Sequence, residues 1–343
     1  MIYKNAELFN VGEIIENNDG SITWLRIPQK VYDKLETGEQ GQRMARGATG
    51  IELRFILKGE SAVIKMSCAS VDGRFHVYRG GVQGGWYDHE THKVVLGDVD
   101  EFEITKAEDA EKLKIMHERL NIDWDSDVVR IIFDKGIFNI YDIVGDIEPP
   151  KPEQCPKKTM LCYGSSITHG SNALDMSHAW ASVLGYNLNV DVRNLGMAGS
   201  CWMEPEFVNY IASEGEKGIW DLATLELGVN VLGWEKEKFK ERIKNTIKEI
   251  AGRNTDKPIF VISPFYLCAE DFDKNCKAGL WREIIENIVR EFNYSNVTYI
   301  NGLDALGDMS GMSADLIHPN IYGVQRIADY LTEKIKSVLK GEF

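Results

Sequence analysis

The segment Leu161-Cys-Tyr-Gly-Ser-Ser-Ile-Thr-His-Gly170 joins a short apolar run to a turn that carries two serines. Residues 159–163 have the length and continuous apolar character of a strand buried on both faces. A serine directly after such a strand presents its hydroxyl at the sheet edge, which makes Ser166 a candidate nucleophile. Gly-Ser-Ser is also ordinary turn chemistry, so this segment alone predicts only a strand and a turn.

The chain around this segment alternates between strand and helix patterns. Strands are expected at residues 159–163, 190–195, 220–227, 258–263 and 297–301, and helices at 179–185, 204–213, 235–251, 278–292 and 320–340. This order predicts a parallel sheet with helices on both faces. Ligands bind such sheets at the carboxyl ends of the strands, where the loops into the helices lie.

The first 145 residues have a different hydrophobic periodicity. Period-2 alternation predicts strands at residues 21–27, 50–57, 61–67, 74–78, 127–133 and 137–141, with one helical patch at 106–120. Short strands with turn signals indicate an antiparallel β-sandwich, jelly-roll-like in form. Four of the nine prolines lie between Pro149 and Pro156, which predicts an extended linker. We therefore expect an accessory sandwich domain at 1–150 and a catalytic domain at 151–343.

Bulk properties exclude several classes of function. The 343 residues exceed one typical core, and the net charge of -14 disfavours nucleic acid or anionic membrane as a partner. No apolar stretch is long enough to span a membrane, and the N-terminus lacks the pattern of a secretory signal. The six cysteines are scattered without a CxxC pair, so reduced thiols, a cytoplasmic location and no zinc site are expected.

Three further segments place reactive side chains after predicted strands or before the last helix. Asn194-Leu-Gly-Met-Ala-Gly199 offers a glycine whose N–H can face a substrate, or is a plain turn. Leu227-Gly-Val-Asn230 offers an amide donor, or a local turn. Asp315-Leu-Ile-His318 places a carboxylate within reach of Nδ1 of the histidine, or is an N-terminal cap pattern.

In this order, the four segments together resemble the SGNH (GDSL-type) hydrolase family over residues 157–343. Ser166 holds the third place of the Gly-Asp-Ser motif, here Gly164-Ser165-Ser166. The resemblance implies a nucleophile at Ser166, a base at His318 supported by Asp315, and an oxyanion hole formed by Ser166, Gly199 and Asn230. It also implies a flavodoxin-like three-layer α/β/α fold and no cofactor or metal.

Two positions depart from the family pattern. Ser165 stands where most members have aspartate, and Val231 follows Asn230 where many have aspartate. The motif Tyr-Gly-Ser-Ser-Ile-Thr, following a predicted β-sandwich in the chain, looks like that of the two-domain acyl esterases and acyltransferases of this superfamily. These departures leave the substrate open.

The expected function is a serine esterase that removes a short acyl group from a carbohydrate or small metabolite. Acetyl is the leading candidate for that acyl group. An acyltransferase with the same three residues stays open, as do a catalytically silent carbohydrate-binding protein and a homo-oligomer. Other features favour ordinary structural roles: His89 and His92 in a surface loop, His169 and His178 in loops or caps, and Cys162 in the core. Trp202 and Met203 suit an acyl pocket or core packing about equally, and Trp86-Tyr87 are surface aromatics that could touch a sugar.

Overall fold

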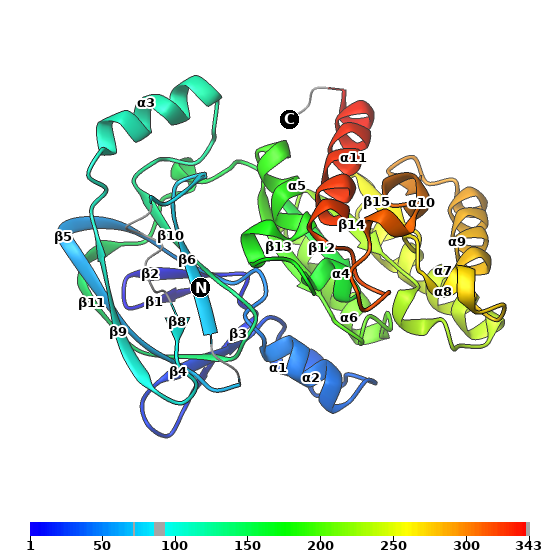
Figure 1. Cartoon of the computed structure of the whole chain (residues 1–343), viewed down its shortest axis with the longest axis horizontal. Helices are drawn as coiled ribbons and strands as arrows, with labels where there is room; N and C mark the ends of the chain where they lie inside the picture. Colours follow the sequence, from blue (N-terminus) through cyan, green and yellow to red (C-terminus); the bar gives the residue numbers. More distant parts are fainter. Residues whose placement is uncertain (71–72, 86–92, 341–343) are drawn as a thin grey trace.

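The computed structural model describes residues 1–70, 73–85 and 93–340. It contains an antiparallel sheet region, blue to cyan in Figure 1, beside a parallel sheet flanked by helices, green to red. This confirms the predicted fold class. Trp86, Tyr87, His89 and His92 lie outside the described residues.

The N-terminal sheet turns a corner through its longest strand, β5 (Glu52–Cys68). Residues 52–56 of β5 pair with β10 (Val128–Phe133) and residues 52–54 with β2 (Ala6–Phe9). Strand β11 (Phe138–Glu148) pairs with residues 56–57 and 62–68, and β9 (Val99–Thr105) with residues 61–67. One strand therefore belongs to both halves of the sandwich. The other strands are β1 Ile2–Tyr3, β2 Ala6–Phe9, β3 Glu13–Glu16, β4 Ile22–Leu25, β6 Gly73–Arg79, β7 Val82–Gln83, β8 Lys93–Val94, β9 Val99–Thr105, β10 Val128–Phe133 and β11 Phe138–Glu148.

The prediction of separate strands at 50–57 and 61–67 was wrong. The polar stretch Lys58-Gly59-Glu60 carries turn residues, but its backbone continues the strand. Between the pairs Gly145–Ala62 and Ile147–Leu57 the register skips four residues of β5 but only one of β11, so the extra residues form a bulge in β5. The predicted helical patch is α3 (Ala110–Leu120), which starts four residues later than expected.

Two short helices, α1 (Gln29–Tyr32) and α2 (Glu39–Arg46), were not predicted. Figure 1 shows them reaching from the sandwich towards the parallel sheet. Val31 and Ala45 are buried in the same apolar cluster as Met197 and Phe207 of the C-terminal half. This segment is therefore part of the core of the parallel-sheet region.

The parallel sheet has the strand order β13-β12-β14-β15-β16. Its strands are β12 Thr159–Gly164, β13 Asp191–Gly196, β14 Leu222–Glu226, β15 Ile259–Ile262 and β16 Val297–Ile300. Alternate residues of β12 enter opposite cores. Leu161 and Tyr163 pack with helices α6 (Pro205–Glu216), α7 (Lys236–Arg253) and α9 (Ala278–Phe292), whereas Met160 and Cys162 pack with α5 (Trp180–Leu188) and α11 (Ile321–Leu339). Burial on both faces explains why these strands are apolar throughout.

The five helices predicted for this half are present as α5, α6, α7, α9 and α11, and three four-residue helices, α4, α8 and α10, were not predicted. Their bounds are α4 Ser166–His169, α5 Trp180–Leu188, α6 Pro205–Glu216, α7 Lys236–Arg253, α8 Ala269–Phe272, α9 Ala278–Phe292, α10 Gly302–Ala305 and α11 Ile321–Leu339, with 3-10 turns η2 Pro152–Gln154, η3 Met176–His178, η4 Val229–Val231 and η5 Met309–Gly311. The first turn, η2, shows that the proline run is not fully extended. Within the described ranges, no helix is both long and apolar enough to cross a membrane.

Buried polar contacts hold the sandwich against the edge strand β13. Arg54 makes a two-pronged ion pair with Asp191, with both N–O distances 2.7 Å. Arg26 donates to the backbone carbonyls of Asn194 at 3.0 Å and Gly196 at 2.9 Å. Because buried charged groups are stabilised only when paired or hydrogen-bonded, these contacts fix the relative position of the two sheets.

Candidate active site

Ser166, His318 and Asp315 form a continuous hydrogen-bonded line. The Ser166 hydroxyl donates to Nε2 of His318 at 2.9 Å, and Nδ1 of His318 donates to Oδ2 of Asp315 at 2.8 Å. Ser166 begins α4 immediately beyond β12, and His318 lies just before α11. The arrangement gives the histidine the tautomer that accepts a proton from a serine hydroxyl.

The loop that carries Asp315 is held in one conformation by its own backbone. Leu316 has a φ of 63°, a left-handed conformation that is uncommon outside glycine. The turn brings the N–H groups of Ile317 and His318 to Oδ1 of Asp315, at 3.0 and 2.9 Å. Partial burial by itself raises the pKa of Asp315, but these hydrogen bonds dominate and hold that pKa well below its usual range. The carboxylate is therefore ionised at neutral pH.

Asn172 is a further contact of Asp315 that sequence reasoning missed. Its Nδ2 donates to Oδ2 of Asp315 at 2.8 Å and to the hydroxyl of Ser313 at 2.9 Å. Asn172 lies in the loop after α4, at a φ of 62° that asparagine tolerates better than most residues. It links the nucleophile segment to the segment that carries the histidine.

The three loops that carry Ser166, Gly199 and Asn230 leave one edge of the sheet. Gly164 at the end of β12 pairs with Gly196 at the end of β13, and Tyr163 pairs with Leu225 of β14. The residues that follow these strands therefore emerge side by side, as expected for a parallel sheet.

Gly199 and Asn230 are both oriented by neighbouring groups. Gly199 has a φ of 68°, and Nε2 of Gln40 donates to the adjacent carbonyl of Ala198 at 2.9 Å. Oδ1 of Asn230 accepts the backbone N–H of Cys201 at 3.0 Å. That contact fixes the amide so that its NH2 group is the end available to a negatively charged oxygen.

Replacing Asn230 tests this assignment. We expect Asn230→Asp to lower kcat by about 10²- to 10³-fold, because the carboxylate still accepts from Cys201 but no longer donates to an oxyanion. Asn230→Ala should fall in the same range. Steady-state kinetics on a p-nitrophenyl ester measures both, and an Asn230→Asp variant within about threefold of wild type would refute the donor role.

Glu226 is a buried carboxylate that sequence reasoning also missed. Its Oε2 accepts the N–H and the hydroxyl of Ser165, both at 2.7 Å, and the hydroxyl of Thr168 at 3.0 Å. The residue before the nucleophile is a serine here, and the acidic group lies on the neighbouring strand β14. The signal in the sequence was a lone glutamate within the apolar run 222–227.

Burial raises the pKa of Glu226 to about 7, although the hydrogen bonds from Ser165 and Thr168 act in the opposite direction. From the ordinary value of 4.5 up to about 7, the folded protein binds more protons at this site than the unfolded chain. The contribution to stability is thus fully present below pH 4.5 and is lost as pH rises through about 7.

Glu226→Gln removes this titration while keeping the size of the side chain. We expect the unfolding free energy of the variant, relative to wild type, to increase by about 3 kcal/mol between pH 4.5 and pH 8. Denaturant unfolding at several pH values measures this difference. Parallel pH profiles for the two proteins would contradict the shifted pKa of Glu226.

The remaining sequence candidates lie outside the hydrogen-bonded line. His169 is buried between the carbonyl of Gly196 and the hydroxyl of Thr49, each 3.0 Å from a ring nitrogen. Burial, aided by the positive charge of Arg26, lowers the pKa of His169 to about 3, so it is a neutral contact between the two sheets. Cys162 is buried in the core as predicted.

Trp202 and Met203 contribute to packing rather than to the line of polar groups. Met203 is buried, and Trp202 makes an edge-to-face contact with Trp234 at a centroid distance of 5.6 Å. Among residues 1–70, 73–85 and 93–340, no three His, Cys, Asp or Glu side chains gather as a metal site would require.

Comparison with known proteins identifies a family to which the C-terminal half is similar. The model of the family described as "GDSL-like Lipase/Acylhydrolase family" matches residues 157–336, a little over half of the chain. No curated protein matches the sequence.

Three solved structures share the two-part architecture. The salicylyl-acyltransferase SsfX3 from a tetracycline biosynthetic pathway aligns with a TM-score of 0.80 at 16% identity, covering 98% of this chain and 95% of that one. A family two carbohydrate esterase from Cellvibrio japonicus gives 0.66 at 12% identity, covering 98% and 96%. The acetyl xylan esterase Est2A from the rumen bacterium Butyrivibrio proteoclasticus gives 0.56 at 11%, covering 86% and 92%. At these identities the likeness establishes the shared fold.

Proposed function

The chain belongs to the GDSL-like lipase/acylhydrolase family. From that premise we propose that it is a serine esterase that removes a short acyl group from a carbohydrate or small metabolite, with acetyl as the leading candidate for the acyl group. The observation that carries the proposal is the unbroken hydrogen-bonded line from Ser166 through His318 to Asp315. The names of the structurally similar esterases support the substrate class.

The reaction proceeds in two halves. Nε2 of His318 takes the proton of Ser166 as Oγ attacks the ester carbonyl, and the ionised Asp315 stabilises the imidazolium. Negative charge on the carbonyl oxygen is held by the N–H groups of Ser166 and Gly199 and by the amide of Asn230. The imidazolium gives its proton to the departing alcohol, leaving an acyl group on Ser166. A water molecule activated by His318 then releases the acid.

An acyltransferase is the second candidate. The observation that favours it is the TM-score of 0.80 with SsfX3, which exceeds the values for the two esterases. Transfer uses the same acyl-enzyme, but an acceptor alcohol takes the place of water in the second half. The two reactions therefore differ only in how well the acceptor competes with water.

Product analysis separates these candidates. We expect acetate release from acetylated xylo-oligosaccharides, and faster hydrolysis of p-nitrophenyl acetate than of the octanoate. Adding xylobiose as an acceptor should leave free acetate as the main product. Acetylated xylobiose as the main product would favour the transferase. No turnover of any ester by the folded protein would instead favour a silent binding protein.

A further inference from the structure

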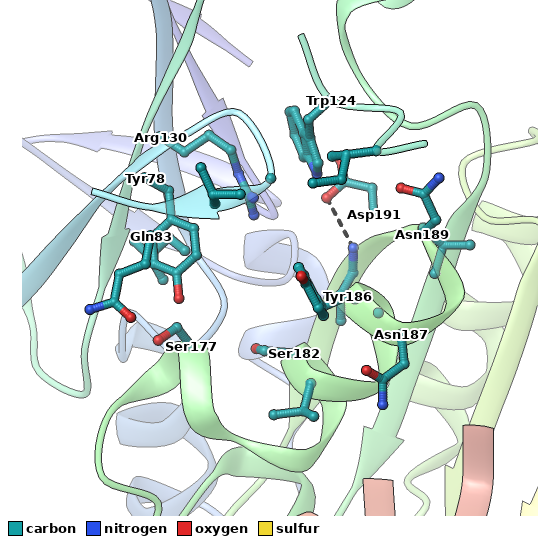
Figure 2. Close-up of a pocket in the computed structure, with 18 of the residues that line it drawn as sticks. Tyr78, Gln83, Trp124, Arg130, Ser177, Ser182, Tyr186, Asn187, Asn189 and Asp191 are labelled. Carbon is teal, nitrogen blue, oxygen red and sulfur yellow. Dashed lines mark hydrogen bonds between the residues drawn. The ribbon is translucent and has the colours of Figure 1, made fainter. Parts of the chain in front are cut away.

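A cavity of about 620 Å³ lies between the sandwich and the parallel sheet, apart from the candidate active site. It is lined by β6 and β10, the loop after α3, helix α5 and strand β13, and Figure 2 shows these side chains. Ser166, Gly199, Asn230, Asp315 and His318 are not among the lining residues. Its volume falls within the range of small-molecule sites, which often form between domains.

The cavity extends along β13 to the end of the sheet opposite the catalytic loops. Asp191 lines it and pairs with Thr159, where both strands begin, whereas Ser166 and Gly199 follow the ends of these strands. Six residues of strand span about 17 Å from first to last. A ligand near Asp191 therefore occupies a different place from an ester bound at Ser166.

The charged groups on the cavity wall are already paired. Glu52 accepts two hydrogen bonds from Arg130, at 2.6 and 2.8 Å, and Asp191 accepts two from Arg54, which lies behind the wall. His178 at the rim lies 3.0 Å from Asp175. The guanidinium groups are thus committed to carboxylates, and the wall favours a neutral ligand over an anion.

Aromatic and amide side chains supply the remaining surface. The guanidinium of Arg130 lies 4.1 Å from the ring centroid of Trp124, which holds that indole in place. Tyr186 on α5 is 61% exposed and stands in the middle of the view in Figure 2, with Gln83 and Tyr78 on the sandwich side. Amides and hydroxyls both donate and accept, and aromatic rings pack against apolar faces. A sugar ring presents both features, namely hydroxyl groups at its rim and C–H faces.

We propose that this interdomain cavity is a second, non-catalytic binding site for a neutral saccharide of one or two rings. The site does not depend on the proposed esterase activity, because no catalytic residue lines it. Tyr186 provides the stacking surface, and Gln83 and Tyr78 face it from the sandwich.

Calorimetric titration with cellobiose and xylobiose tests the proposal in the full-length protein. Ser166 is first blocked with a fluorophosphonate, so that neither turnover nor an open catalytic cleft accounts for the signal. We expect saturable binding whose Kd is the same within twofold before and after blocking. The anionic sugars glucuronate and glucose 6-phosphate should bind at least 10-fold more weakly.

Substitutions on the exposed face of α5 assign the site. Tyr186→Ala should weaken binding about 10-fold or more, as removal of an aromatic anchor does, whereas Tyr186→Phe should stay within about threefold. Phe272→Ala removes a similarly exposed ring from another element, α8, and should leave Kd unchanged. Unaltered thermal melting of each variant shows that it is folded.

The proposal is overturned by any of three results. These are no saturable binding of either disaccharide, binding that disappears on blocking Ser166, or binding that Tyr186→Ala leaves unaltered in a folded protein.

Discussion

Replacing Ser166 by alanine should lower kcat/KM for any ester substrate by about 10⁴- to 10⁶-fold. The hydroxyl of Ser166 is the only one that contacts Nε2 of His318 in the part of the chain that the structure describes. Without it no acyl-enzyme forms. The residual reaction is direct attack of water on the ester, in a site that still stabilises the oxyanion. His318→Ala should reduce the rate to a similar extent, since the two side chains act as a unit.

Ser165 is the matched control for this experiment, because it is the same residue type one position earlier. Its hydroxyl donates to Glu226 rather than to His318. We therefore expect Ser165→Ala to retain activity within about 10-fold of wild type, with the larger effect on stability. A greater loss of activity in Ser165→Ala than in Ser166→Ala would show that the assigned nucleophile is wrong by one residue.

Asp315→Asn should lower kcat by about 10⁴-fold with little change in the size of the side chain. Every group within hydrogen-bond distance of this carboxylate donates to it: Nδ1 of His318, the N–H groups of Ile317 and His318, the amide of Asn172 and the hydroxyl of Ser313. The NH2 group of the new asparagine would face one of these donors. If it faces His318, the ring adopts the tautomer with the proton on Nε2, which is unable to accept the proton of Ser166.

Kinetics on p-nitrophenyl acetate measures the effect of Asp315→Asn, and Asn172→Ala is its control. Loss of one of several donors to Asp315 should lower kcat only about 10-fold, because His318 keeps its partner. If Asp315→Asn retained a tenth or more of the wild-type kcat, the carboxylate would not be needed to orient His318.

The fold of the C-terminal half could be predicted because its signals are local and repeated. Each strand from β12 to β16 is a short apolar run followed by a helix pattern, and the structure has all five in the expected places. In the N-terminal half, the alternation predicted strands but not the continuity of β5, since Lys58-Gly59-Glu60 carries the residues of a turn. The strand is recognised as one element because β11 pairs with it on both sides of this stretch, at Leu57 and at Ala62.

Short elements that depend on distant packing could not be predicted. Helix α1 has four residues and α2 eight, and their apolar residues are buried against the other half of the chain. An isolated sequence of that length gives no helix signal, because short helices are stabilised by tertiary contacts. The contact of Gln40 on α2 with the loop of Gly199 could not be predicted either, because it depends on the same packing.

The proximity of Ser166, His318 and Asp315 could be predicted, but their supporting contacts could not. The prediction that these three residues meet rested on the order of the four segments along the chain. Asn172 and Glu226 are polar residues without a motif, and their roles depend on which strand ends are neighbours in the sheet. The resemblance to a family also gave no indication that a glutamate on β14 would contact Ser165.

Reaction of the folded protein with a fluorophosphonate probe, followed by peptide mass spectrometry, tests the central assignment most directly. The line of hydrogen bonds predicts one adduct, on Oγ of Ser166, and its loss in the His318→Ala variant. An adduct on Ser165, or an unlabelled Ser166 in a protein that still cleaves esters, would contradict it.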